Sequence, residues 1–70
     1  MHRKYVQSSN LLTVGYDEVA LILEVQFRNG GVYPYEGVPL SEYLALMTAE
    51  SKGSYFDRHI RNKYNYRKRQ

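Results

Sequence analysis

The chain has 70 residues, no cysteine and a formal net charge of +3. A chain this short forms one domain and is too small to enclose a deep catalytic cleft by itself. The lack of cysteine excludes disulfides as a stabiliser and suits a reducing compartment, so we expect a cytoplasmic protein. The longest apolar run, residues 19–23, is far shorter than the roughly 20 residues that a membrane span requires.

Acidic and basic residues are separated along the chain. Residues 5–57 contain all seven acidic residues but only two basic ones, Arg28 and Lys52. Residues 58–70 contain six Lys or Arg residues and no acid. The sequence therefore predicts a mildly acidic body with a basic C-terminal end.

Two strands are predicted after an N-terminal arm formed by residues 1–7. The first strand covers residues 10–16, where Leu12, Val14 and Tyr16 alternate with Leu11, Thr13 and Gly15. The second covers residues 20–27 and places Glu24 and Gln26 opposite its apolar side chains. We therefore expect Glu24 and Gln26 to lie on the exposed face of a sheet.

An Asn-Gly-Gly run at residues 29–31 predicts a hairpin into a third strand over residues 32–38. The register of this hairpin decides which face carries Tyr33 and Tyr35, because a shift of one residue exchanges the two faces. A two-residue loop would expose both rings. We favour a three-residue loop, because it sets apolar side chains opposite one another. This loop would pair Phe27 with Tyr33 and Val25 with Tyr35.

Two helices are predicted after the strands. Residues 39–48 begin with a proline, which is favoured at a helix start, and carry apolar side chains at helical spacing. A break at residues 50–53 precedes a second helix, which starts at the capping-box-like segment 54–57 and ends near Tyr64. Strands followed by helices are typical of an α+β fold. We therefore expect a three-stranded antiparallel sheet with two helices packed on one face.

Residue types suited to catalysis are present, but their pattern does not indicate an enzyme. The residue types of a hydrolytic triad are supplied by Ser8 or Ser9, His59, and Asp17 or Asp57. The sequence nevertheless lacks the Gly-x-Ser-x-Gly turn that presents a nucleophilic serine. The two isolated histidines, His2 and His59, do not make an ordinary structural zinc site. We expect no enzymatic activity, no metal and no cofactor.

The basic end indicates binding of phosphate. Arg58 and Arg61 lie opposite the apolar stripe of the predicted second helix. Cations attract phosphate and tyrosine rings stack on bases, so we predict a module that binds RNA or single-stranded nucleic acid. The same charges would also suit a solvated helix face with a solubilising tail. The predicted phosphate-binding residues are Arg58, Arg61, Lys63, Lys52, Arg67, Lys68 and Arg69, and the predicted stacking residues are Tyr33, Tyr35, Tyr55 and Tyr64.

Two other functions fit the same residues. A nucleotide or cyclic nucleotide could be sequestered with its phosphate on Arg58 or Arg61, or on the helix N-terminus near residues 51–54. A second copy of the chain could complete such a pocket, so a homo-oligomer remains open. Alternatively, exposed tyrosines could dock a partner protein.

Short motifs that resemble one family are spread over residues 6–64. They are Ser8-Ser9-Asn10, Val14-Gly15-Tyr16-Asp17, Leu23-Glu24-Val25-Gln26-Phe27, Asn29-Gly30, Tyr33-Pro34-Tyr35, Val38-Pro39, Ser51-Lys52-Gly53-Ser54-Tyr55-Phe56, Arg58-His59-Ile60-Arg61 and Tyr64. Together they resemble the KTSC domain, a family named for the C-terminus of some lysyl-tRNA synthetases. The family also occurs as stand-alone small bacterial and phage proteins.

The resemblance implies a domain over residues 8–64, followed by a basic tail over residues 65–70. RNA binding is suggested for the family by its tRNA-synthetase context, which is an association and not a mechanism. No set of catalytic residues is implied. Pro34 stands where a polar residue is expected within the family's tyrosine-any-tyrosine motif. Because proline has no N–H, its strand should lie at a sheet edge, or the side of the strand to which the proline nitrogen points should be unpaired.

Overall fold

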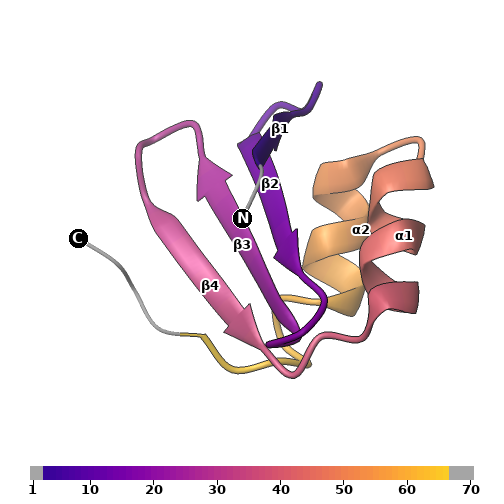
Figure 1. The fold of residues 1–70 in the computed structure, drawn as a ribbon. Helices are drawn as coiled ribbons and strands as arrows, with labels where there is room; N and C mark the ends of the chain where they lie inside the picture. Colours follow the sequence, from indigo (N-terminus) through magenta and orange to yellow (C-terminus); the bar gives the residue numbers. More distant parts are fainter. Residues whose placement is uncertain (1–2, 67–70) are drawn as a thin grey trace.

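Four strands precede two helices in the computed structural model, which describes residues 3–66 (Figure 1). The strands are β1 (Arg3–Tyr5), β2 (Leu11–Asp17), β3 (Ile22–Phe27) and β4 (Val32–Glu36), and the helices are α1 (Leu40–Thr48) and α2 (Lys52–His59). The strands form one antiparallel sheet in the order β1-β2-β3-β4, and both helices cover the same face of it (Figure 1). The predicted α+β fold is confirmed, with four strands instead of three. Neither of these helices is long and apolar enough to cross a membrane.

The additional strand, β1, lies in the segment that was predicted to be an N-terminal arm. Arg3 pairs with Gly15 and Tyr5 pairs with Thr13, both in antiparallel register with β2. All three residues of β1 are exposed, so their sequence carries no alternation of buried and exposed side chains. A strand of this kind is defined by its partner and not by its own apolar pattern, which explains why the sequence did not predict it.

An ion pair between an exposed arginine and a buried carboxylate connects β1 to β3 on the face of the sheet that points away from the helices. Arg3 lies opposite Gly15, and Gly15 lies opposite Glu24. Because Gly15 has no side chain, the Arg3 guanidinium can pass over it and form an ion pair with the Glu24 carboxylate. Glu24 was predicted to be exposed, but only 3% of it is accessible. The prediction was wrong because it did not include β1.

The core lies between the sheet and the helices. Phe56 of α2 is its largest fully buried side chain. The Phe56 ring meets Phe27 and Tyr35 edge-on, with centroid separations of 5.5 and 5.3 Å, which is a favoured arrangement of aromatic rings. The other fully buried side chains are Leu11, Val14, Leu23, Val25, Val38, Leu46 and Ile60. The apolar faces of the strands and helices therefore meet in one cluster.

The register of the β3–β4 hairpin differs from both predicted registers. Val25 pairs with Tyr33 and Leu23 pairs with Tyr35. The predicted pairs, Phe27 with Tyr33 and Val25 with Tyr35, are therefore wrong by two residues. A shift of two residues leaves every side chain on its face. Tyr33 and Tyr35 consequently lie on the same face as Val25, as the favoured register implied.

The conformation of Gly30 explains why the register of the β3–β4 hairpin differs by two residues from the predicted one. Phe27 N donates to Gly31 O at 2.9 Å, so the loop contains residues 28–30 and not residues 29–31. Gly30 has a φ of 99°, which is accessible to glycine and costly for other residues. Asn29 Oδ1 accepts a hydrogen bond from Gly31 N at 3.1 Å and supports the turn. The loop still has three residues, with the positive φ at its last position.

The position of Pro34 agrees with the expectation for proline, because β4 is an edge strand of the sheet. Part of this edge is covered by the end of the described chain. Glu36 N donates to Asn65 O at 2.8 Å, and Tyr35 forms an antiparallel bridge with Tyr66. Asn65 and Tyr66, which were predicted to belong to a loose tail, therefore contact the sheet.

Helix α2 begins earlier than predicted. Ser51 is its N-cap, and the Ser51 Oγ accepts a hydrogen bond from Ser54 N at 3.3 Å. The predicted start at residues 54–57 is therefore wrong, and the break predicted at residues 50–53 is shorter. Gly53, which suggested a break, lies inside the first turn of the helix.

Helix α2 also ends earlier than predicted, at His59 instead of near Tyr64. Arg61 N donates to Phe56 O at 2.9 Å, which is a bond to the residue five positions back. This bond replaces the i to i−4 pattern and ends the α-helix. Tyr64 lies in the turn that follows, and its N–H donates to Ile60 O at 3.2 Å.

One residue of the β2–β3 turn is strained. Leu21 has a φ of 58°, in the left-handed region that costs a residue with a Cβ roughly 1–2 kcal/mol. Its carbonyl oxygen accepts a hydrogen bond from Val38 N at 2.9 Å, which ties the turn to the chain before α1. Asp17 holds the other end of the turn, because its Oδ1 accepts from Val19 N and Ala20 N at 3.0 and 3.1 Å.

Arg3→Ala tests the ion pair between β1 and β3. We expect this change to lower the free energy of unfolding by about 1–3 kcal/mol, because it removes the charged partner of a buried carboxylate. Lys4→Ala removes an exposed cation from the same strand and should cost less than about 0.5 kcal/mol. Denaturant unfolding of both variants measures the difference. Equal losses would contradict the role assigned to the Arg3–Glu24 pair.

Candidate functional site

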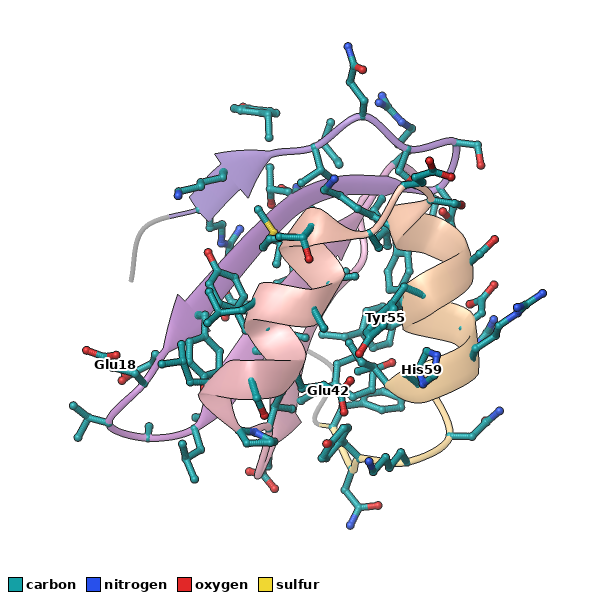
Figure 2. The ribbon with its side chains drawn as sticks, turned by 90° about the vertical axis from the view of Figure 1, so that its right-hand side faces the viewer. Glu18, Glu42, Tyr55 and His59 are labelled. Carbon is teal, nitrogen blue, oxygen red and sulfur yellow. The ribbon has the colours of Figure 1, made fainter. Side chains whose placement is uncertain are left out.

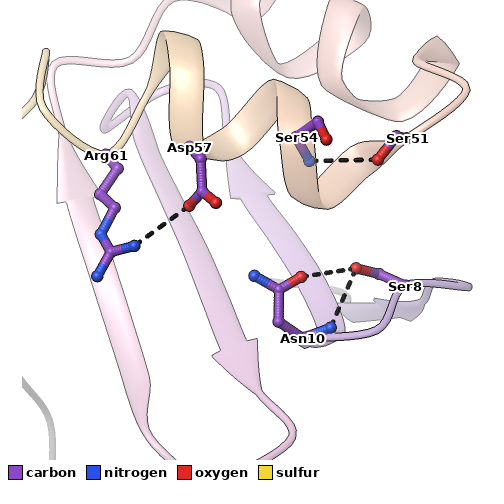
Figure 3. Close-up of polar contacts among 6 residues, drawn as sticks. All are labelled: Ser8, Asn10, Ser51, Ser54, Asp57 and Arg61. Atoms are coloured by element: carbon purple, nitrogen blue, oxygen red, sulfur yellow. Dashed lines mark hydrogen bonds and ion pairs between the residues drawn. The ribbon is translucent and has the colours of Figure 1, made fainter.

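Two arginines predicted to bind phosphate lie at the end of α2. Arg58 and Arg61 are both exposed. Arg61 Nη1 lies 3.3 Å from Asp57 Oδ1, and the two side chains are 64% and 48% exposed (Figure 3). An exposed ion pair of this type contributes little to stability. The Arg61 guanidinium can therefore exchange the Asp57 carboxylate for another anion at small cost.

An aromatic cluster lies along β4. The Tyr66 ring packs against Tyr33 and Tyr35, with centroid separations of 4.9 and 5.0 Å. Tyr66 is 48% exposed, whereas Tyr33 is partly buried. Sequence reasoning did not include Tyr66 among the stacking residues, because its pairing with β4 is a long-range contact. Its position among the basic residues of the C-terminal end was the available signal.

Tyr35 does not have an exposed ring. It is 3% exposed and packs on Phe56, so the prediction that Tyr35 stacks on a base is wrong. Burial raises the pKa of Tyr35 to about 12, and the positive charge of Arg61 acts in the opposite direction. The charge of Arg61 thus acts on the Tyr35 hydroxyl, which relates this one arginine to the aromatic cluster.

Three other predicted binding residues converge on one carboxylate of α1, Glu42, and Figure 2 shows Tyr55 of α2 beside it. The Tyr55 hydroxyl donates to Glu42 Oε1, and the Tyr64 hydroxyl donates to Glu42 Oε2 at 2.9 Å. Lys63 Nζ lies 3.6 Å from Oε2, and the Glu42 side chain is only 10% exposed. The Tyr55 ring also stacks on His59, with a centroid separation of 4.3 Å. We call Glu42, Lys63, Tyr55 and Tyr64 the Glu42 clamp.

The clamp sets the protonation of its members. Burial alone would raise the pKa of Glu42, but the hydrogen bonds from Tyr55 and Tyr64 and the charge of Lys63 outweigh it and hold the pKa below 4.5. The hydrogen bond to Glu42, together with burial, raises the pKa of Tyr55 to about 12. Burial, followed by the hydrogen bond to Glu42, raises the pKa of Tyr64. The clamp therefore joins α1 to α2 and its C-terminal turn through a carboxylate that stays charged. Nucleic-acid contacts by Lys63, Tyr55 and Tyr64 stay predictions.

The N-terminus of α2, predicted as an alternative phosphate site, contacts the chain's own side chains (Figure 3). Ser8 Oγ donates to Asn10 Oδ1 at 2.9 Å and accepts from Asn10 N at 3.4 Å. A Cβ placed on Gly53 would lie 2.5 Å from Asn10 Oδ1, so the Asn10 amide lies directly against the first turn of α2. Lys52 Nζ donates to Ala49 O at 3.3 Å, at the end of α1. These contacts give Gly53 and Asn10 a packing role.

Three of the residues that could have formed a hydrolytic triad contact other partners. Ser8 bonds to Asn10, His59 stacks on Tyr55, and Asp57 pairs with Arg61. Within residues 3–66, no group of three His, Cys, Asp or Glu side chains could hold a metal ion. Arg67, Lys68 and Arg69 lie outside the described residues, so their predicted role in phosphate binding stays a prediction.

Comparison with known proteins places the chain in a family. The model of the KTSC domain matches residues 7–64. The chain belongs to the KTSC domain family. The resemblance carried by the short motifs is therefore confirmed, and the match includes the whole of α1, α2 and the Glu42 clamp.

This KTSC protein is similar in sequence to two other proteins and in both sequence and fold to a third. An uncharacterised protein from Stutzerimonas stutzeri is 46% identical over 57 residues, which cover 81% of this chain and 80% of the relative. A lysine–tRNA ligase from Trichormus variabilis is 39% identical over 51 residues, which cover 73% of this chain but 9% of the enzyme. The crystal structure of a KTSC domain protein from Yersinia pestis is similar with a TM-score of 0.95 and 43% identity, covering 99% of this chain and 97% of that one. The chain is thus similar to a stand-alone protein and to a small part of a larger enzyme.

Glu42→Gln should weaken the clamp in a pH-dependent way. Because the pKa of Glu42 in the folded chain lies below 4.5, its contribution is fully present above pH 4.5 and is lost as the pH falls through the folded value. We expect Glu42→Gln to lower the free energy of unfolding by about 1–2 kcal/mol at neutral pH. Denaturant titrations of both proteins at several pH values should show this difference shrinking in acid. A difference that does not change with pH would contradict the charged clamp.

Gly53→Ala tests the close approach of Asn10 to α2. The new Cβ would lie 2.5 Å from Asn10 Oδ1 and 3.1 Å from Ser8 Oγ, so we expect a loss of about 1 kcal/mol. In an Asn10→Ala background the same substitution should become neutral or stabilising, because alanine is the better helix former by about 1 kcal/mol. A double-mutant cycle measured by thermal or denaturant unfolding gives the coupling. An equal effect of Gly53→Ala in both backgrounds would rule out the contact as its cause.

Proposed function

We propose that this KTSC protein is a binding module for RNA or single-stranded nucleic acid. The proposed surface consists of Arg58, Arg61, Tyr33 and Tyr66, and we call it the β4-edge surface. The observation that carries the proposal is the half-exposed Tyr66, whose ring packs against Tyr33 and against Tyr35, the tyrosine on which the positive charge of Arg61 acts. A fixed aromatic ring next to a cation is the combination that binds a base and its phosphate together.

The geometry supports a single strand more than a duplex. A base must unstack from its neighbours, and in a duplex also unpair, before it can stack on a protein ring. The free energy required is lowest in a single strand. Tyr66 is partly ordered by its contacts with Tyr33 and Tyr35, so little conformational entropy remains to be lost when a base stacks on it. Arg61 is held only by an exposed pair with Asp57, which a phosphate can replace.

The relation to a lysine–tRNA ligase agrees with this class of ligand. The name of that enzyme states an action on tRNA, and its matching segment covers most of this chain. The relation supports RNA by association only, because it does not identify a contacting residue.

Nucleotide sequestration is the second candidate, and the structure favours it less. The helix N-terminus that would hold its phosphate lies against Asn10, and Lys52 is directed to Ala49 O. The Arg61 side of α2 would still be available to a mononucleotide. A thermal-shift series separates the two functions, since a mononucleotide binder would be stabilised by mononucleotides and not by oligonucleotides.

Titration of a labelled short single-stranded RNA, followed by fluorescence anisotropy, tests the β4-edge surface. We expect Tyr66→Ala to weaken binding by about 1–3 kcal/mol, because it removes a stacking ring. Arg61→Ala should weaken binding and reduce the slope of log affinity against log salt by about 1. Lys4→Ala, on the opposite edge of the sheet, removes the same charge and should have a clearly smaller effect.

Two results would contradict the proposal. The first is the lack of any binding at low salt, where attraction to phosphate is strongest. The second is an equal effect of Lys4→Ala and Arg61→Ala on affinity and salt slope, which would indicate attraction by net charge without a defined surface.

A further inference from the structure

A second surface of the molecule exposes aliphatic side chains and shares no residue with the β4-edge surface. Its members are Val19, Leu21, Leu40 and Leu44, which are 92%, 41%, 42% and 52% exposed. We call these four residues the aliphatic surface. Isolated exposed aliphatic residues are common, but a group of them at one end of a small domain indicates an interaction site.

The turn after β2 and the first part of α1 bring these residues together. Leu21 O accepts a hydrogen bond from Val38 N at 2.9 Å, two residues before Leu40. Leu40 and Leu44 are one turn apart on α1, and helical geometry places them opposite Glu42 on the helix. Figure 2 shows Glu42 on the α2 side of α1 and the turn with Glu18 on the other side. The two leucines therefore project toward the side of the molecule that carries the turn.

The aliphatic surface is held in place by its backbone. Asp17 accepts two hydrogen bonds from the N–H groups of Val19 and Ala20, and Leu21 is kept in a left-handed conformation. Glycine would adopt that conformation without strain. A leucine at this position therefore presents an apolar side chain at a cost in stability, which is typical of a residue kept for binding.

The charged side chains of the turn that carries Val19 and Leu21 are both acidic. Residues 17–22 contain Asp17 and Glu18 and no Lys or Arg, whereas Glu42 faces α2 and pairs with Lys63. A symmetric dimer through this surface would bring two acidic turns together, and like charges at an interface disfavour association. A basic partner would instead gain from Asp17 and Glu18.

We propose that the aliphatic surface docks a basic amphipathic segment of a partner protein. The apolar side of such a segment, with side chains at helical spacing, packs along Leu40 and Leu44 and against Leu21. Lys and Arg residues on its flanks face Asp17 and Glu18. The proposal is independent of nucleic-acid binding, because it uses another side of α1 and other residues.

The test uses two synthetic helical peptides with the same leucine spacing, one with lysine and one with glutamate on its flanks. Amide chemical shifts of the protein, measured by NMR during titration, report both the affinity and the site. We expect the lysine peptide to perturb residues 18–21 and 40–45. Leu44→Ser should lower the affinity for the lysine peptide at least ten-fold. Tyr5→Ser should leave this affinity unchanged, because Tyr5 is 81% exposed but lies on β1, away from the aliphatic surface.

Leu21→Gly adds a check on folding, because it relieves a strained φ while removing one aliphatic contact. We expect this variant to stay folded and to bind the lysine peptide more weakly. The proposal is overturned if the lysine peptide does not bind, or if the glutamate peptide binds equally well. It is also overturned if the wild-type protein self-associates and Leu44→Ser abolishes the association, because the occupant would then be a second copy.

Discussion

The contact of Phe56 with the sheet is the interaction on which the rest of the structure depends. Its buried ring meets Phe27 of β3 and Tyr35 of β4 edge-on, and it thereby fixes both the distance and the rotation of α2 relative to the sheet. Arg58 and Arg61 follow Phe56 by two and five residues, so their direction is set by the same contact. The approach of Gly53 to Asn10 at the other end of the helix depends on it as well.

The many tyrosines of the chain divide into distinct roles around this core. Tyr35 is buried, Tyr55 and Tyr64 donate their hydroxyls to Glu42, and Tyr66 keeps about half of its ring exposed. A hydroxyl lets a large apolar ring lie at the boundary of a small core with its polar end satisfied. In a domain without cysteine, such anchored rings and the Glu42 clamp provide order that a small apolar core alone supplies only in part.

The faces of the strands could be predicted from the sequence, and the long-range contacts could not. Alternation in β3 identified the core side of Val25, and apolar pairing gave the correct face for Tyr33 although the register was wrong by two residues. Strand β1 and its ion pair with Glu24 leave no apolar pattern, because all three β1 residues are exposed. The convergence of tyrosines on Glu42 also left no signal, since Tyr64 and Glu42 are 22 positions apart. The prediction that Arg58 is exposed succeeded because helical periodicity places it opposite Phe56, whereas Arg61 is exposed although it lies beyond the end of α2.

The proposed function requires that the molecule binds nucleic acid through a defined basic and aromatic edge and not merely through a basic end. Mapping of backbone amide shifts by NMR during titration with a short single-stranded RNA at low salt tests it most directly. We expect the largest changes in β4 (Val32–Glu36) and between Arg58 and Tyr66, and no change in β1 (Arg3–Tyr5). Changes spread evenly over all basic residues, or concentrated in β1, would contradict it.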